Sequence, residues 1–199
     1  MDFVKRYLED VGRIAEAIDR QAVCRLVDVL GEVRAGGGRL FVIGVGGSAA
    51  NASHAVNDFR KLTDLEAYTP TDNVSELTAR INDEGWETSF VNWLKASRLS
   101  ARDGVLVFSV GGGDVERKIS LNIVRAAEYA RSLGARVCGI LGRDGGATAT
   151  VADVFVLVPT VDPAMVTPHA EAFQAVLWHL LVSHPRLRTA PPKWEGLSS

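Results

Sequence analysis

Two pairs of ionisable side chains are spaced so that each pair can lie along one helix. His54 and Asp58 are four residues apart, and Glu171 and His179 are eight apart. With ~3.6 residues per turn, the first pair shares a helix face and the members of the second lie about 80° apart around the axis. If the two helices pack side by side, we expect two imidazoles and two carboxylates to converge.

Such a group of side chains supports two kinds of chemistry. Two imidazoles and two carboxylates can hold zinc or another borderline divalent ion in tetrahedral geometry. Without a metal, a carboxylate and an imidazole can abstract a proton next to a carbonyl. The spacing does not choose between these. Taken alone it favours a plainer interpretation, in which His54–Asp58 is a surface pair and His179, flanked by Trp178 and Leu180, is a core histidine.

A glycine-rich segment, Gly44–Ser48, lies between an apolar run at 40–43 and a helical pattern. Glycines allow close approach of a ligand, and the first N–H groups of a helix attract anions. We therefore interpret Gly46, Gly47 and Ser48 as candidate phosphate donors. The spacing matches neither a nucleotide P-loop nor the dinucleotide fingerprint. The alternative is a tight strand–helix turn that needs glycine for packing alone.

A second glycine-rich segment follows another apolar run, at 105–109. Ser109, Gly111, Gly112 and Gly113 could close over the other side of the same ligand. The next residue, Asp114, suits the N-cap of a helix, although its charge would repel a phosphate in the same pocket. The segment is thus equally well interpreted as a structural cap and as a ligand loop.

The order of the remaining patterns predicts an α/β fold. We expect one long helix or two over residues 2–34, with Gly31 as a possible break. Strands that are apolar throughout are typical of a parallel sheet covered on both faces, and ligands of such sheets bind at the carboxyl ends of the strands. The prediction is a doubly wound three-layer αβα sandwich with strands at 40–43, 65–69, 105–109, 136–141 and 154–158, and helices at about 48–61, 73–82, 87–98, 114–133 and 168–183.

Composition narrows the class of protein. With 199 residues the chain fits a single domain, with an N-terminal helical extension at 1–35, a core at 36–185 and an extended tail at 186–199. A net charge of −2 gives no reason to expect nucleic acid or a membrane as partner. No apolar run approaches the ~20 residues that a membrane span needs, and the N-terminus does not have the pattern of a signal peptide. Cys24 and Cys138 are interpreted as buried thiols in a reducing compartment, so we expect a cytoplasmic protein.

The stretch Gly44–His54 resembles the signature of the phosphoheptose isomerases, within the sugar isomerase (SIS) domain superfamily. Similarity continues through Asn82-Asp83, the segment 105–114, the loop 142–146, Ala152-Asp153 and the last helix up to His179. The resemblance implies an enzyme that converts sedoheptulose 7-phosphate, through an enediol(ate), into a D-glycero-D-manno-heptose 7-phosphate for heptose-nucleotide synthesis. It also implies a homotetramer with sites at subunit interfaces.

The resemblance also implies roles for individual residues. Zinc, bound in several members, would be held by His54, Asp58, Glu171 and His179, with Asp58 and His179 also carrying the proton transfers. The implied substrate-binding residues are Gly46, Gly47, Ser48, Asn51, Asn82, Asp83, Ser109, Gly111, Gly112, Gly113 and Glu171.

This chain departs from the family pattern at several of these positions. Asp58 replaces a glutamate and Glu171 a glutamine, which adds a negative charge that favours a divalent cation. Val45 replaces an asparagine. The serine- and threonine-rich phosphate loop is reduced to Ser109, with Val110, Gly111 and Asp114 at the other hydroxyl positions.

Three other functions remain open from the sequence. One is isomerisation of another ketose phosphate, such as an octulose phosphate. Another is a non-catalytic SIS-domain binding protein of the type that associates with a replication initiator, and a third is a sugar-phosphate sensor. The paired acids and imidazoles favour an enzyme, because a binding module does not need them.

Overall fold

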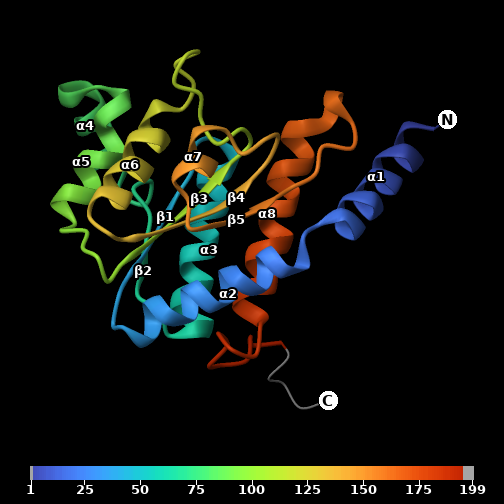
Figure 1. Ribbon diagram of the computed structural model, residues 1–199, viewed down its shortest axis with the longest axis horizontal. Coiled ribbons are helices and arrows are strands. Elements are labelled where there is room, and N and C mark those ends of the chain that lie inside the picture. The colour runs from blue at the N-terminus through green and yellow to red at the C-terminus, as the bar shows by residue number, and fades with distance from the viewer. Residues whose placement is uncertain (1, 195–199) are drawn as a thin grey trace.

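A five-stranded parallel sheet forms the centre of the computed structural model, which describes residues 2–194 (Figure 1). The strand order is β2-β1-β3-β4-β5, and every neighbouring pair is parallel. The predicted doubly wound sandwich is therefore confirmed. The strands are β1 (Leu40–Ile43), β2 (Ala67–Tyr68), β3 (Gly104–Ser109), β4 (Arg136–Leu141) and β5 (Val154–Leu157).

Helices cover both faces of the sheet, and each face has its own apolar core. On one face lie α2 (Arg20–Ala35), α3 (Gly47–Thr63) and α8 (Val166–Ser183); on the other lie α5 (Ser89–Ala96) and α6 (Leu121–Ser132), with α7 (Gly146–Val151) beside α6. The remaining helical elements are α4 (Val74–Glu84) and the short 3₁₀ turns at Trp86–Thr88 and Pro163–Met165.

The N-terminal extension consists of two helices, α1 (Phe3–Ala17) and α2, and α1 reaches away from the body of the molecule (Figure 1). The break falls at Ile18–Asp19, where Asp19 Oδ1 accepts hydrogen bonds from the N–H groups of Gln21 and Ala22. The chain stays helical through Gly31, so the predicted break at that glycine is wrong: an N-capping aspartate begins the second helix instead.

Three other local predictions need correction. The helix predicted to begin at 114 begins at Leu121, because 114–120 forms a loop closed by a backbone bridge between Asp114 and Ile119. Asp114 is therefore not the cap of that helix, and its Oδ1 accepts from the N–H of Arg117 within the loop. The helix α7 was not predicted. The thiol of Cys24 is exposed rather than buried, because it lies on the outer side of α2.

The guanidinium of Arg34 ties three segments together at one end of the molecule. It donates hydrogen bonds to the carbonyl oxygens of Thr63 (2.8 Å), Leu187 (2.6 Å) and Arg186 (2.9 Å). The ends of α2 and α3 are thus joined to the chain that follows α8. That chain turns at 185–187 and buries Leu187, unlike the extended tail predicted for 186–199; residues 195–199 of this prediction lie outside the described residues.

A buried carboxylate stabilises the amino ends of the strands. Asp103 accepts hydrogen bonds from the backbone and guanidinium of Arg39 and from the backbone and hydroxyl of Ser100. Burial acts to raise the pKa of Asp103, but these hydrogen bonds outweigh burial and hold the pKa below its usual value. Among residues 2–194, no helix is long and apolar enough to cross a membrane.

Candidate active site

Buried amide contacts set the register between α3 and α8. Asn51 Nδ2 donates to the backbone carbonyl of Glu171 (2.9 Å) and to Gln174 Oε1 (3.1 Å), and Gln174 Nε2 donates to Ser48 Oγ (3.0 Å). Ser48 and Gln174 are almost completely buried. Because both side-chain protons of Asn51 are bound to α8, the structure gives this predicted substrate-binding residue a role in holding the two helices together.

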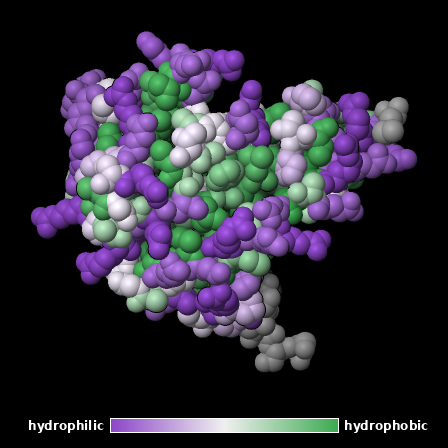
Figure 2. Space-filling model, viewed as in Figure 1, coloured by the Kyte–Doolittle hydropathy of each residue, from purple (hydrophilic) through white to green (hydrophobic). Residues whose placement is uncertain are grey.

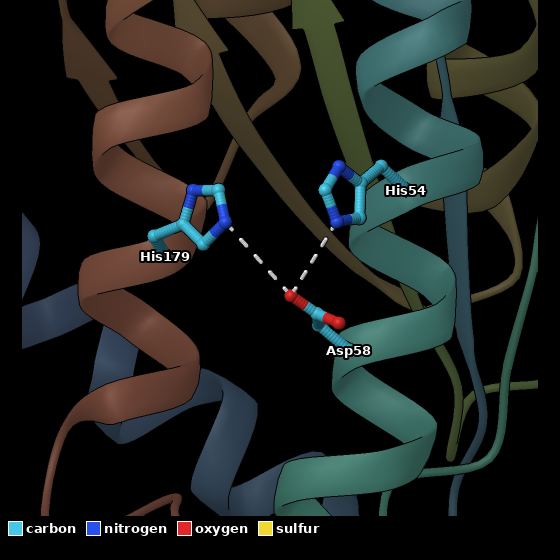
Figure 3. Close-up of side chains that lie close together, drawn as sticks. All are labelled: His54, Asp58 and His179. Atoms are coloured by element: carbon cyan, nitrogen blue, oxygen red, sulfur yellow. Dashed lines mark ion pairs between the residues drawn. The ribbon is translucent and has the colours of Figure 1, made fainter. Parts of the chain in front are cut away.

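Further along the same helix pair, three side chains point toward one another (Figure 3). Asp58 Oδ2 lies 3.9 Å from His54 Nε2 and 3.9 Å from His179 Nε2. One ligand atom from each of the three residues lies within 4.8 Å of the others. The carboxylate is mostly buried, whereas His54 and His179 are 60% and 52% exposed, so the cluster opens to the surface between the helices.

The surroundings of the two imidazoles orient their free nitrogen atoms toward Asp58. His179 Nδ1 lies 2.8 Å from the carbonyl oxygen of Ala175, one turn back on α8. Because a carbonyl can only accept, Nδ1 carries the proton, and the lone pair of neutral His179 is on Nε2, which faces Asp58. His54 packs on the buried ring of Trp178, with ring centroids 4.6 Å apart.

This donor set fits a borderline divalent cation such as zinc. Zinc accepts imidazole nitrogen and carboxylate oxygen at ~2.0–2.1 Å, and three protein ligands leave a fourth position for water or substrate. Tetrahedral ligands at that bond length are about 3.3 Å apart. The two pairs with Asp58 are 3.9 Å apart and all three ligand atoms lie within 4.8 Å of one another, so the side chains would have to move closer together on binding the ion. A second-sphere carbonyl on the far nitrogen of His179 is the usual arrangement for a ligating histidine.

Glu171 does not join this cluster in the structure. Its carboxylate instead lies against Gly47 at the start of α3, so closely that a Cβ atom on Gly47 would be 2.4 Å from Glu171 Oε2. Within this chain three of the four predicted ligands converge, and Glu171 is not among them. The physical reason is distance along the helix, since eight residues at 1.5 Å each separate Glu171 from His179 by about 12 Å.

A cleft of about 640 Å³ lies at the carboxyl ends of the strands. Of the predicted substrate-binding residues, Ser48, Ser109, Gly111 and Gly113 line it. Gly46, with φ of +63°, is the N-cap of α3 and is not among the residues that line the cleft. Ser48 lies six residues before His54, about 9 Å along the helix axis. The cleft therefore lies beside the start of α3, and the cluster lies further along the same helix.

The glycine loops after β3 and β4 interlock at the cleft wall. Gly112, with φ of +67°, approaches Gly145 so closely that a Cβ atom would be 1.8 Å from the carbonyl oxygen of Gly145. The carbonyl of Gly112 accepts from the N–H (2.9 Å) and hydroxyl (2.7 Å) of Thr148, and its N–H donates to Ser109 Oγ (2.9 Å). Gly112 itself therefore has a structural role.

Two predicted residues lie away from the cleft within this chain. Asn82 and Asp83 are exposed near the end of α4, where Asn82 Nδ2 donates to Asp83 Oδ1 (2.7 Å). Conversely, Arg117, Ser120 and Arg143 line the cleft and were not predicted as site residues. For Arg143 a signal existed, because it lies in a glycine-rich loop that directly follows a buried strand.

Comparison with known proteins places this geometry in a family. The family model described as SIS domain matches residues 6–142. Phosphoheptose isomerase of Geotalea daltonii is 31% identical over 186 residues, covering 89% of this chain and 91% of that protein. Lincomycin biosynthesis protein LmbN of Streptomyces lincolnensis is 31% identical over 192 residues, covering 91% and 68%.

A solved structure agrees with these sequence relatives. Phosphoheptose isomerase GmhA of Neisseria gonorrhoeae superposes with a TM-score of 0.76 at 26% identity, covering 90% of this chain and 94% of that one. The resemblance predicted from the sequence is thus confirmed: the chain belongs to the SIS-domain family and, within it, to the phosphoheptose isomerases.

Proposed function

We propose that this protein is an aldose–ketose isomerase that acts on sedoheptulose 7-phosphate. The observation that carries the proposal is the convergence of His54, Asp58 and His179 about 9 Å along α3 from a cleft lined by glycines and serines. A long ketose phosphate carries its carbonyl and its phosphate near opposite ends. The cluster suits the carbonyl end and the cleft the phosphate end.

In the metal-free mechanism, Asp58 removes a proton from C1, next to the C2 carbonyl, and an enediolate forms. His179, as an imidazolium that carries a second proton on Nε2, gives this proton to C2, while the hydroxyl proton of O1 moves to O2 by way of solvent. The product is an aldose with its carbonyl at C1. The proton on Asp58 then returns to His179, whose Nε2 lies 3.9 Å from the carboxylate.

Zinc bound by His54, Asp58 and His179 would act as a Lewis acid that polarises the substrate carbonyl. A carboxylate that binds a metal tightly is not a free base, so the roles of Asp58 differ between the two forms. The exposed sides of both imidazoles leave room for a substrate oxygen at this point.

The decisive experiment measures conversion of sedoheptulose 7-phosphate to the aldose, with chelator and with added zinc. We expect turnover in the wild type, loss in His179→Ala, and retention in a matched control, His184→Ala, whose imidazole lies outside the cluster. Absence of turnover under every metal condition would refute the assignment. Turnover that survives chelation would remove only the metal from the mechanism.

An octulose phosphate, the alternative substrate that the sequence leaves open, belongs in the same assay. The reason is that the loop expected to receive the phosphate is altered, with Val110, Gly111 and Asp114 at positions where the family has hydroxyl groups. A higher kcat/KM for the octulose phosphate than for sedoheptulose 7-phosphate would identify the octulose phosphate as the preferred substrate.

We further propose that the protein works as a homotetramer in the cytoplasm. Val176 and Leu180 are 52% and 42% exposed on the helix that carries His179, and hydrophobic side chains gather over α8 in Figure 2. Exposed apolar patches favour association of subunits, which supports the tetramer. The two unpaired cysteines are typical of a reducing compartment, which supports the cytoplasm. Light scattering should give four times the 21.4 kDa chain mass; an active monomer would contradict the proposal.

A further inference from the structure

We propose that Arg143 binds the phosphate group of the substrate, in place of the hydroxyl groups that the second glycine loop lacks. The inference rests on the proposed function, because it names the group that the 640 Å³ cleft would hold. It concerns a residue outside the set expected from the family resemblance.

The backbone around Arg143 holds its side chain at the cleft. Arg143 adopts φ of +53°, in the left-handed region that side-chain-bearing residues rarely occupy. Its loop is fixed by the interlocked contact between Gly112 and Gly145. The Cδ atom of Arg143 would lie 3.4 Å from a Cβ atom on Gly111, so the absence of a side chain at 111 leaves space beside the arginine.

The charges around the cleft leave this guanidinium available. Within residues 2–194, Arg143 takes part in no ion pair or side-chain hydrogen bond, although Asp144 follows it. Asp144 Oδ1 accepts from the N–H of Gly146 in its own loop. The other arginine of the cleft, Arg117, faces the carboxylate of Asp114 at 3.6 Å. Among the described residues, the carboxylates of Asp114, Glu116 and Asp144 also line the cleft, and none of them is paired with Arg143, so its guanidinium is available to a ligand.

Arginine suits this task chemically. Its planar guanidinium can donate two parallel hydrogen bonds to a phosphate, and the pair is charge-assisted. Ser48 and the first turn of α3 line the same cleft and add a partial positive charge. Removal of such a contact should weaken phosphate binding by about 10- to 100-fold.

The test compares Arg143→Gln with Arg98→Gln in the full-length protein. Arg98 is a matched control, because it is also exposed, also has φ of +53°, and lies outside the cleft. Calorimetry with inorganic phosphate at constant ionic strength measures binding without turnover. Steady-state kinetics with sedoheptulose 7-phosphate then separate KM from kcat, and thermal melting checks that both variants fold alike.

We expect Arg143→Gln to weaken phosphate binding and raise KM by about 10- to 100-fold, with a smaller change in kcat. Arg143→Lys should recover part of the loss, because it retains the charge. Equal phosphate affinity in Arg143→Gln and Arg98→Gln would overturn the proposal, as would a loss found only in Arg117→Gln. Arginine-dependent phosphate binding without turnover of any ketose phosphate would support the phosphate assignment and refute the proposed reaction.

Discussion

The contact between Gly112 and Gly145 makes a quantitative prediction for the substitution Gly112→Ala. A Cβ atom at position 112 would lie 1.8 Å from the carbonyl oxygen of Gly145 and 2.4 Å from its carbonyl carbon. Both are backbone atoms, so no side-chain rotation can relieve the overlap. The two glycine loops must separate by more than 1 Å, roughly, before an ordinary van der Waals distance is restored.

The expected cost has two parts. A non-glycine residue in the left-handed region costs about 1–2 kcal/mol. Separation of the loops also breaks the two hydrogen bonds from Thr148 to the carbonyl of Gly112 and the one from the N–H of Ala147 to the carbonyl of Gly113. At about 0.5–1.5 kcal/mol each, these add about 1.5–4.5 kcal/mol.

Gly37→Ala isolates the first part of this cost. Gly37 has φ of +65°, close to the +67° of Gly112, but no atom lies within 4 Å of its Cβ position. This variant should therefore lose only about 1–2 kcal/mol. The difference between the two variants is the cost of opening the interlock. At about 2–4 °C per kcal/mol for a chain of this size, Gly112→Ala should melt about 3–18 °C below Gly37→Ala.

Urea unfolding measures the free energy of unfolding of each variant, and thermal denaturation measures its melting temperature. Inorganic phosphate binding, measured in parallel, should weaken in Gly112→Ala and stay unchanged in Gly37→Ala, because only the first displaces the cleft wall. Equal stability and equal phosphate affinity in the two variants would show that the loops do not interlock. The loop that carries Arg143 would then not be fixed by the contact between Gly112 and Gly145.

Three further outcomes follow from other parts of the structure. Zinc at 100 times its dissociation constant should raise stability by about 2.7 kcal/mol, seen as a higher melting temperature, and the shift should vanish in Asp58→Asn; an equal shift in both would exclude the cluster as the site. Asp103→Ala should lose about 3–5 kcal/mol at pH 7 by leaving Arg39 unpaired. The fold lowers the pKa of Asp103, so this stabilisation is present above the unfolded pKa of ~3.9 and is lost as pH falls through the folded pKa. In urea unfolding at low pH, the wild type and the variant should therefore have similar free energies of unfolding. In the native protein a thiol reagent should modify Cys24 alone, because burial raises the pKa of the Cys138 thiol; after unfolding it should modify both. Rapid reaction at both positions in the native protein would show that Cys138 is not buried.

Much of the fold was predictable because the strands carry strong local signals. The runs 40–43 and 105–108 are apolar throughout and lead into glycine-rich loops, which is typical of buried parallel strands. The failures occur where the local signal is ambiguous. Val115 and Ile119 gave the segment 114–120 a helical appearance, but both are exposed and find no core to pack on. The six-residue helix α7 contains two threonines and a valine, residues that seldom favour a helix.

The site was predictable only where its spacing is local. His54 and Asp58 lie on one helix, so four residues of separation suffice to bring them together. The approach of His179 depends on how α3 and α8 pack, which no local spacing determines. The direction of the Glu171 carboxylate depends on a rotamer beside Gly47. For Arg143 the glycine-rich loop after a buried strand was a signal, but its place at the cleft depends on contacts between loops more than thirty residues apart, which no local pattern determines.

The hydrogen bonds of Arg34 also affect the geometry of the His54, Asp58 and His179 cluster. One guanidinium joins the last turn of α3 to the chain just after α8, so it restrains both helices at the end nearest Asp58 and His179. At the other end, Gln174 bridges to Ser48. Held at both ends, the helices cannot slide past each other by a turn without breaking one of these contacts. The spacing of the two imidazoles is in this way determined by residues that never touch them.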